Sequence, residues 1–179
     1  MALNFSNMQN GDALLADIRH LYESAFPADE RRDFDLVVEI LRDNGKFGIR
    51  VGTGGDSGEL RSFISFWDFG NFTYIEHFAV AAAMRGQGIG HKAVDDFMSN
   101  VSSRIVIEVE PPVDVITRKR VAFYESLGFT LHAGYKYIQP AYAPHLNEIE
   151  LRLMTLGDFS PEELEAAALT IKREVYPSF

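Results

Sequence analysis

The sequence predicts an α/β (α+β) fold in which a mixed, mostly antiparallel sheet is flanked by helices, with an extra C-terminal helix. Three observations lead to this prediction. Apolar residues recur at helical spacing in some segments and alternate with polar residues in others. The two kinds of segment are interspersed along the chain instead of forming separate blocks. Turn and breaker residues stand between them, such as Asn44-Gly45 and Pro111-Pro112.

The length and composition suit one globular domain over residues 1–179, since 46% of the residues are hydrophobic. No apolar run approaches the ~20 residues that would span a bilayer, so no membrane partner is expected. The N-terminus lacks the basic and apolar regions of a signal peptide, which makes a cytoplasmic location the expectation. The absence of cysteine excludes disulfides, thiolate metal sites and a cysteine nucleophile.

The charge narrows the class of partner. The formal net charge is −9. Nucleic-acid binding relies on clustered Lys and Arg, so no nucleic-acid partner is expected. The charge mildly favours a cationic partner, although a solvated acidic surface would produce the same balance.

The N-terminal half is predicted as a strand, two helices and three strands. Residues 3–8 form the strand, and residues 12–25 carry an apolar stripe at helical spacing that ends before Pro27. The charged loop FPADERRDF leads into the second helix. Segments 46–52 and 60–69 are expected to pair as a hairpin around a glycine-rich loop, and residues 72–80 continue the meander.

The C-terminal half continues with an amphipathic helix after Ile89, a strand over 104–110 and a helix over 117–127. Strands are predicted over 129–137 and 148–154. The last helix starts at Ser160, which forms a capping box with Glu163 and is followed by Pro161 at the first helical position.

The stretch 74–90, YIEHFAVAAAMRGQGIG, joins a strand to a helix through a glycine-rich turn. Gly86, Gly88 and Gly90 permit positive φ and leave no Cβ between a ligand and the backbone. The free amides at a helix start bind phosphate oxygens, and Arg85 can add a charge-assisted contact. Glycines at such a junction also serve tight packing alone, so this motif is not specific by itself.

Two other phosphate-binding motifs do not fit the turn. A P-loop ends in Gly-Lys-Ser/Thr, whereas Gly90 is followed by His91 and Lys92. A Rossmann fingerprint needs G-x-G-x-x-G spacing in a βαβ unit, whereas three strands in a meander precede this turn.

The chain resembles the GNAT acyltransferase superfamily, and two blocks carry the resemblance. Arg85, Gly88 and Gly90 match the family's R/Q-x-x-G-x-G/A loop directly after a strand that ends in Ala79-Val80. RVAFYESLGF, residues 120–129, matches the second family block one helix and one strand later. The segments FPADER and YIQPAY also look like pieces of bacterial members.

The resemblance implies that acetyl-CoA lies between the strands 72–80 and 104–110. It implies that the backbone of Phe78, Ala79 and Val80 contacts the pantetheine arm and the thioester. It implies that the backbone amides of the turn bind the pyrophosphate. These are the amides of Arg85, Gly86, Gln87, Gly88, Ile89 and Gly90. One departure is Thr117, because many members have a cofactor-contacting Asn at this position, seven residues before the tyrosine of the second block.

Two residues are the catalytic candidates. An amine must lose its proton before it attacks a thioester, and Glu76 is the candidate base because it shares a strand face with Phe78. Tyr124 matches the family's tyrosine and is the candidate acid for the coenzyme A thiolate. An ion pair for Glu76 and a core position for Tyr124 are the structural alternatives. His77 faces the other way as a structural residue, and no metal is predicted.

The acceptor pocket is expected between the variable segments 26–34 and 135–146, by analogy with relatives. Five of their side chains could orient a substrate, although each also suits an ordinary loop surface: Arg31, Arg32, Tyr137, Tyr142 and His145.

The resemblance therefore predicts an N-acetyltransferase that moves an acetyl group from acetyl-CoA to a primary amine by direct attack. The amine could belong to a small molecule or a peptide. The alternative is a non-catalytic acyl-CoA-binding sensor or interaction module. The helix from Ser160 could form a homodimer contact or could pack on its own sheet.

Overall fold

The computed structural model describes residues 3–8, 13–55, 58–101 and 104–176. The elements follow in the order β1 (Leu3–Asn7), α1 (Leu15–Ala25), η1 (Ala28–Glu30), α2 (Phe34–Asp43), β2 (Phe47–Gly54), β3 (Glu59–Asp68), β4 (Phe72–Val80), η2 (Ala82–Met84), α3 (Ile89–Asn100), β5 (Arg104–Val109), α4 (Val115–Ser126), β6 (Thr130–Leu131), β7 (Tyr137–Gln139), β8 (Ile149–Leu156) and α5 (Pro161–Val175).

The chain divides into two compact units, and each is described by itself. The first unit comprises Met1–Pro27, Asp33–Asp68 and Ile75–Ser102. The second unit comprises Ala28–Arg32, Phe69–Tyr74 and Ser103–Phe179. The prediction of a single domain over the whole chain stays a prediction.

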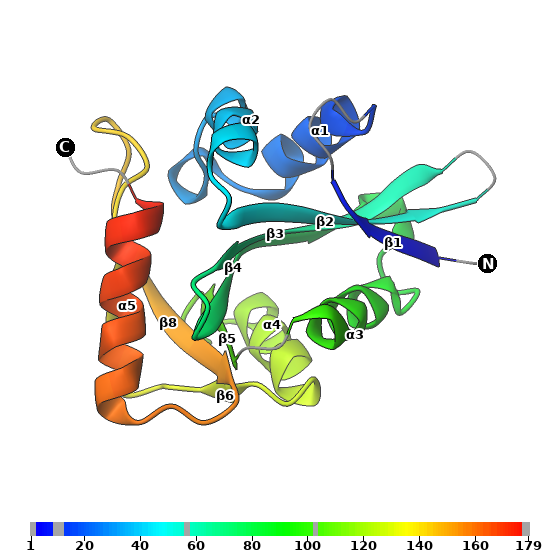
Figure 1. Ribbon diagram of the computed structural model, residues 1–179. Coiled ribbons are helices and arrows are strands. Elements are labelled where there is room, and N and C mark those ends of the chain that lie inside the picture. Colours follow the sequence, from blue (N-terminus) through cyan, green and yellow to red (C-terminus); the bar gives the residue numbers. More distant parts are fainter. Residues whose placement is uncertain (1–2, 9–12, 56–57, 102–103, 177–179) are drawn as a thin grey trace. The chain divides into compact units, whose positions relative to one another are not determined.

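In the first unit, β1, β2 and β3 form an antiparallel meander, with Phe5 opposite Gly52 and Val51 opposite Phe63. Helices α1 and α2 contact one side of these strands and α3 contacts β3 from the other side (Figure 1). The alternation along β2 places Ile49 and Val51 in the core, at 2% and 1% exposure. The sheet is thus sandwiched between helices, as interspersed periodicities predict.

In the second unit, β8 is the central strand. It pairs antiparallel with β5, placing Ile107 opposite Met154, and also with β6 and β7. Helix α4 packs on β5 and β6. Helix α5 buries one face, which consists of Leu164, Ala167, Ala168, Ile171 and Val175. That apolar face is therefore occupied within the protein itself.

The helix starts follow from local capping chemistry. The Asp33 carboxylate accepts from the amide of Asp35 at the start of α2. Ser160 and Glu163 form the predicted capping box of α5, with Pro161 in its first turn. The α5 signals lie within four residues and were predicted from the sequence alone, whereas the Asp33 cap was not predicted.

One predicted strand is wrong. The segment 129–137 contains only the two-residue strand β6, and the chain then turns before β7 begins at Tyr137. The amide of Tyr135 donates to the His132 carbonyl at 3.0 Å, which closes the turn that contains Gly134. A turn bond there replaces the ladder bonds that a continuous strand would have made.

No helix within the described part of the chain is long and apolar enough to cross a membrane.

Candidate active site

The nine predicted cofactor-binding residues lie together at the end of β4, in the turn after it and in the first turn of α3, all in the first unit. Ala79 is buried, whereas Phe78 and Val80 are half-buried. The Arg85 side chain folds back over the turn, and its Nε donates to the Val80 carbonyl at 3.1 Å. The side chain thereby ties the end of the strand to the exposed turn.

Two glycines shape the turn through their backbone conformation. Gly86 and Gly88 have φ values of 75° and 74°, a region that L-residues with a side chain rarely adopt. A Cβ added at either position would meet no atom within 4 Å. The glycines are therefore required by the path of the chain and not by close packing. Gly90 differs from the expectation, because it lies inside α3 without a positive φ.

The start of α3 suits an anion. Gly88 is the N-cap and offers no side-chain hydrogen bond. The first amides of a helix have no partner within it and carry its positive dipole end. The turn from Arg85 to Gly88 is exposed, so a pyrophosphate could reach these amides.

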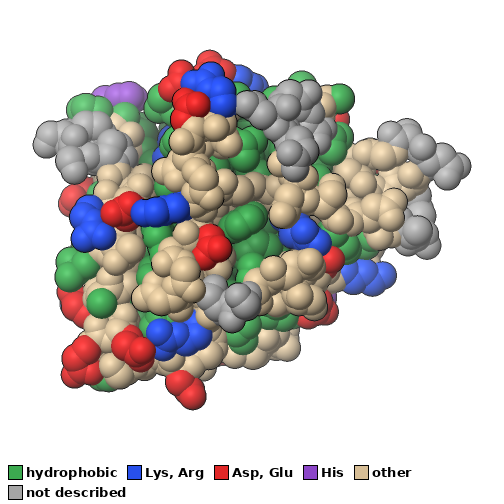
Figure 2. Space-filling model, viewed as in Figure 1, with side chains coloured by type: hydrophobic (Ala, Val, Ile, Leu, Met, Phe, Trp, Pro, Cys, Tyr) green, Lys and Arg blue, Asp and Glu red, His purple; other side chains and the backbone are tan. Residues whose placement is uncertain are grey.

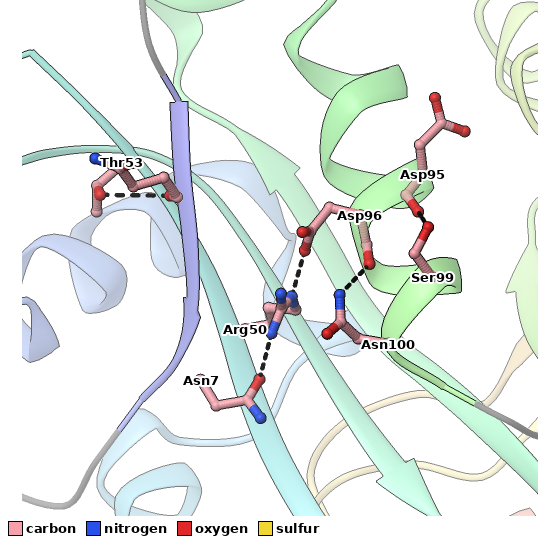
Figure 3. Close-up of polar contacts among 8 residues, drawn as sticks. Asn7, Arg50, Thr53, Asp95, Asp96, Ser99 and Asn100 are labelled. Carbon is pink, nitrogen blue, oxygen red and sulfur yellow. Dashed lines mark hydrogen bonds and ion pairs between the residues drawn. The ribbon is translucent and has the colours of Figure 1, made fainter.

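Helix α3 is fixed to the sheet by a polar cluster (Figure 3). Asp96 of α3 pairs with the Arg50 guanidinium of β2, and their side chains are only 25% and 12% exposed. Arg50 also donates to the Asn7 side-chain oxygen of β1 at 3.0 Å. A partly buried pair with an added hydrogen bond holds its geometry more firmly than a surface pair. The cluster therefore fixes the helix that follows the glycine turn.

Glu76 lies on β4 and is half-buried. The indole Nε1–H of Trp67 on β3 donates to its Oε2 at 2.8 Å. The predicted base thus has a neutral hydrogen-bond donor beside it, and an indole N–H can only donate.

His77 belongs to the core, as predicted from the alternation of the strand. It is 4% exposed, and its ring packs edge-on against Tyr22 and Phe26 at centroid distances of 4.8 and 4.7 Å. Its Nδ1 lies 3.4 Å from the Ser65 hydroxyl. The packing accounts for this histidine without a catalytic role.

Tyr124 lies on α4 in the second unit. It is 8% exposed and packs edge-on against Phe123 and Phe129. Burial raises the pKa of Tyr124 to about 12, against a smaller lowering by Arg120. The phenol is therefore protonated throughout the neutral range, as a proton donor must be.

Thr117 has a role in the helix start. Its hydroxyl accepts from the Asp114 amide at 3.1 Å, while the Asp114 carboxylate accepts from the Thr117 amide at 2.8 Å. This reciprocal pair is a capping box for α4. The position where many relatives have a cofactor-contacting Asn is thus engaged in capping.

A carboxylate–tyrosine cluster occupies the second unit, formed by Glu108, Tyr74, Tyr137, Tyr142 and Tyr176. The Tyr176 hydroxyl donates to Glu108 Oε2 at 2.8 Å and lies 3.3 Å from the Tyr74 hydroxyl. Burial, together with the nearby Glu108 carboxylate, raises the pKa of Tyr176 and of Tyr137 well above the usual value. Both tyrosines therefore stay neutral beside the carboxylate.

The five side chains expected at the acceptor pocket fall into two groups. Arg32, Tyr137 and Tyr142 are buried at 7%, 0% and 5% exposure, so they are not the loop surface that their sequence context also suited. Arg32 donates to the Val175 carbonyl and stacks over Tyr142 at 5.0 Å. Arg31 is half-buried and His145 is exposed.

Three residues with evident roles escaped the sequence reasoning: Trp67, Glu108 and Tyr176. Glu108 carried a usable signal, because it is the one acidic residue within the apolar run IVIEV of a central strand. Trp67 and Tyr176 reach their carboxylates across strand and helix neighbours, and no local pattern reveals such contacts.

Two further features bear on the site. Among the described residues, no three Asp, Glu or His side chains are grouped so as to hold a metal ion. A pocket of about 330 Å³ in the second unit is lined by residues that include His132, Tyr135 and Phe159, and none of its lining residues is a predicted site residue.

Comparison with known proteins agrees with this geometry. Residues 15–129 match the model of the acetyltransferase (GNAT) family. An inferred GNAT-family acetyltransferase from Bacteroides thetaiotaomicron superposes with a TM-score of 0.88 and 29% identity, covering 98% of this chain and 99% of that chain. No match was found among curated proteins.

Two more distant structures show the fold alone. The ribosomal-protein-S18-alanine N-acetyltransferase of Escherichia coli has a TM-score of 0.64 and 17% identity over 89% of this chain and 97% of that chain. YncA of Salmonella typhimurium, solved with its cofactor acetyl-CoA, has a TM-score of 0.61 and 18% identity over 90% and 98%. Together with the closer superposition, they confirm the predicted α/β fold with a mixed, mostly antiparallel sheet and the C-terminal helix α5.

Proposed function

The chain belongs to the GNAT acetyltransferase family, and on this premise we propose that it transfers an acetyl group from acetyl-CoA to a primary amine by direct attack on the thioester. The observation that carries the proposal is the arrangement in the first unit. A carboxylate, Glu76, stands on the strand that leads directly into an exposed glycine turn and an uncapped helix start.

The cofactor would bind along the end of β4 and the turn. The backbone of Phe78, Ala79 and Val80 would hold the pantetheine arm as an added strand partner, since main-chain groups at a strand end can bond an extended amide chain. The amides from Arg85 to Gly90 would hold the pyrophosphate. Val80 already accepts from Arg85, which keeps this end of the strand in place.

The reaction needs one bond made, one bond broken and a balanced set of proton transfers. The amine nitrogen forms a bond to the acetyl carbon, and the bond from that carbon to sulfur breaks. Glu76 would accept one proton of the acceptor ammonium, so that the neutral amine can attack. Tyr124 would give its phenol proton to the coenzyme A thiolate, and the second proton that the nitrogen loses as the amide forms would restore the phenol. Tyr124 is protonated at neutral pH, although its raised pKa makes it a weaker acid than an ordinary phenol.

For the acceptor, we propose a small-molecule or peptide amine. The negative net charge favours approach of a cationic amine over a nucleic acid. Arg32 and Tyr142 are held against the end of α5, which suits them to shaping a pocket wall more than to forming a mobile surface.

The alternative function, a non-catalytic acyl-CoA-binding module, rests on Thr117. Its hydroxyl is bonded within the α4 capping box, so the helix lacks the Asn that contacts the cofactor in many relatives. Such a module would bind acetyl-CoA without turnover of any amine.

Release of coenzyme A in the presence of a broad amine panel tests the proposal. The chain has no cysteine, so a thiol reagent detects only the released coenzyme A. With an amine that is turned over, Glu76→Gln should lower kcat by roughly 10²–10⁴-fold, because general base catalysis is lost. Tyr124→Phe should lower kcat while acetyl-CoA affinity, measured by calorimetry, stays unchanged.

The matched control is Glu39→Gln on the exposed side of α2, which should not alter kcat. Acetyl-CoA binding without turnover of any amine would favour the non-catalytic module. Unchanged turnover in both active-site variants would show that the assigned roles are wrong.

A further inference from the structure

The bond between Trp67 and Glu76 is a specific feature of the candidate site. Trp67 is the single tryptophan of the chain, and its Nε1 lies 2.8 Å from Glu76 Oε2. Both residues belong to the first unit. A solvent-exposed carboxylate can accept its hydrogen bonds from water alone. A buried indole N–H that donates to the proposed base therefore calls for an explanation.

The chemistry of the donor suits a base that must stay ionised. An indole N–H only donates, so it stabilises the carboxylate form and offers nothing to the O–H of the neutral acid. It is also uncharged, unlike Lys or Arg, so it does not hold the carboxylate in a tight ion pair. The bond engages Oε2 and thereby sets the direction of the carboxyl plane.

Trp67 itself is rigidly placed. It is 2% exposed, and it lies directly opposite Phe47 in the β2–β3 register with the ring centroids 5.1 Å apart. A cross-strand aromatic pair of this kind restricts both rings. A donor that is ordered before substrate binds holds its acceptor without further entropy loss during the reaction.

We propose that Trp67 is a positioning residue that holds the Glu76 carboxylate correctly directed to take the proton of the acceptor amine. This inference rests on the proposed function, since it assumes that Glu76 is the base. It assigns to the single tryptophan a role that its burial in the core does not require.

The bond itself is tested by the indole N–H resonance, of which the chain has only one. In wild-type protein this resonance should lie downfield, because the proton is bonded to a carboxylate. In Glu76→Gln it should move upfield, because a neutral amide is a weaker acceptor. An indole resonance that does not change in Glu76→Gln would overturn the contact and the proposal with it.

The role is tested by Trp67→Phe, which keeps an aromatic ring opposite Phe47 and removes the donor. It should lower kcat about 10- to 100-fold, because a misdirected base loses the alignment on which proton transfer depends. The KM for the amine and the affinity for acetyl-CoA should change little.

The matched control is Phe63→Leu, which shortens another buried aromatic side chain of β3 that packs on Tyr22 and leaves the Phe47–Trp67 pair in place. It should lower stability in urea unfolding and leave kcat near the wild-type value. If Trp67→Phe and Phe63→Leu reduce kcat equally, Trp67 is only a packing residue and the proposal is wrong.

Different outcomes would contradict the proposed function and the positioning role of Trp67. If wild-type protein turns over no amine in the panel, the proposed function fails. If Glu76→Gln lowers kcat and Trp67→Phe does not, the base assignment stands and only the positioning role is overturned.

Discussion

Two buried tyrosines of the second unit differ in one hydrogen bond. The Tyr176 hydroxyl donates to Glu108 at 2.8 Å. The Tyr137 hydroxyl is fully buried beside the same carboxylate, whose charge and hydrogen bonding help to raise its pKa, but its contact with Glu108 lies outside normal hydrogen-bond geometry. A hydrogen bond to a charged group contributes more to stability than one between neutral groups. The two hydroxyls should therefore contribute unequally to the free energy of unfolding.

Tyr176→Phe should lower the free energy of unfolding by about 1.5–3 kcal/mol, because it removes a donor to a part-buried carboxylate. Tyr137→Phe should change it by less than about 1 kcal/mol, because a buried hydroxyl in poor hydrogen-bond geometry gives little in return for its desolvation. Urea unfolding of the two variants measures both values. Equal losses would mean that ring packing, and not the hydroxyl, sets the contribution of Tyr176.

At the scale of elements, the turn between β4 and α3 combines a required conformation with open space around it. Gly88 has a positive φ and caps a helix that the Arg50–Asp96 pair fixes to β2. The same helix start presents the amides proposed to bind the pyrophosphate. Conformational strain introduced there should appear both in stability and in cofactor affinity.

Gly88→Ala should cost about 1–2 kcal/mol, because a residue with a Cβ is disfavoured in the left-handed region. It should also raise the Kd for acetyl-CoA, since the amides lose their direction. Gly45→Ala is the control, because Gly45 has an ordinary φ and a Cβ there would meet nothing within 4 Å. It should leave Kd unchanged. An unchanged Kd in Gly88→Ala would remove this turn from the cofactor site.

Helix α4 begins at a cap whose strength depends on pH. Hydrogen bonds, first that from the Thr117 amide, hold the pKa of Asp114 below its usual 3.8. A lowered folded-state pKa gives stability that is fully present above the unfolded value and is lost as pH falls through the folded value. The pH range over which this carboxyl group changes the stability therefore lies below its usual pKa.

Asp114→Asn keeps a capping side chain that cannot titrate. The difference in unfolding free energy between wild-type protein and this variant should be constant above roughly pH 5 and should shrink as the pH falls toward about 3. Urea unfolding across this range measures it. A difference that stays constant to the lowest pH would show that the cap carries no linkage.

At the scale of the whole molecule, acidic side chains are spread over the face seen in Figure 2, with a group at the lower left, where Figure 1 places the start of α5. Glu162 and Glu163 are in that first turn, where a negative charge interacts favourably with the helix dipole. Part of the net charge of −9 thus stabilises a helix start instead of awaiting a partner.

The sequence predicted what short-range chemistry determines. The Ser160–Glu163 capping box and the glycine turn each span only a few residues, so both could be recognised in the sequence. The two family blocks added the fold. The strand over 129–137 was wrong, because its alternating pattern did not register the turn around Gly134.

Contacts between distant residues could not be predicted. Trp67 meets Glu76 only if β3 and β4 adopt one particular register. Tyr176 reaches Glu108 across 68 positions of the sequence. Arg32 and Tyr142 looked like loop surface, because nothing in their neighbours shows that the end of α5 covers them.

The capping box of α4 also limits what the side chain at position 117 can do. An Asn at this position would supply the side chain that the resemblance assigns to the cofactor. The same replacement would remove the hydroxyl that accepts from the Asp114 amide, while the Asp114 carboxylate would still accept from the backbone amides of residues 116 and 117. Half of the cap would therefore persist. A single side chain at this position thus serves either the helix start or a ligand.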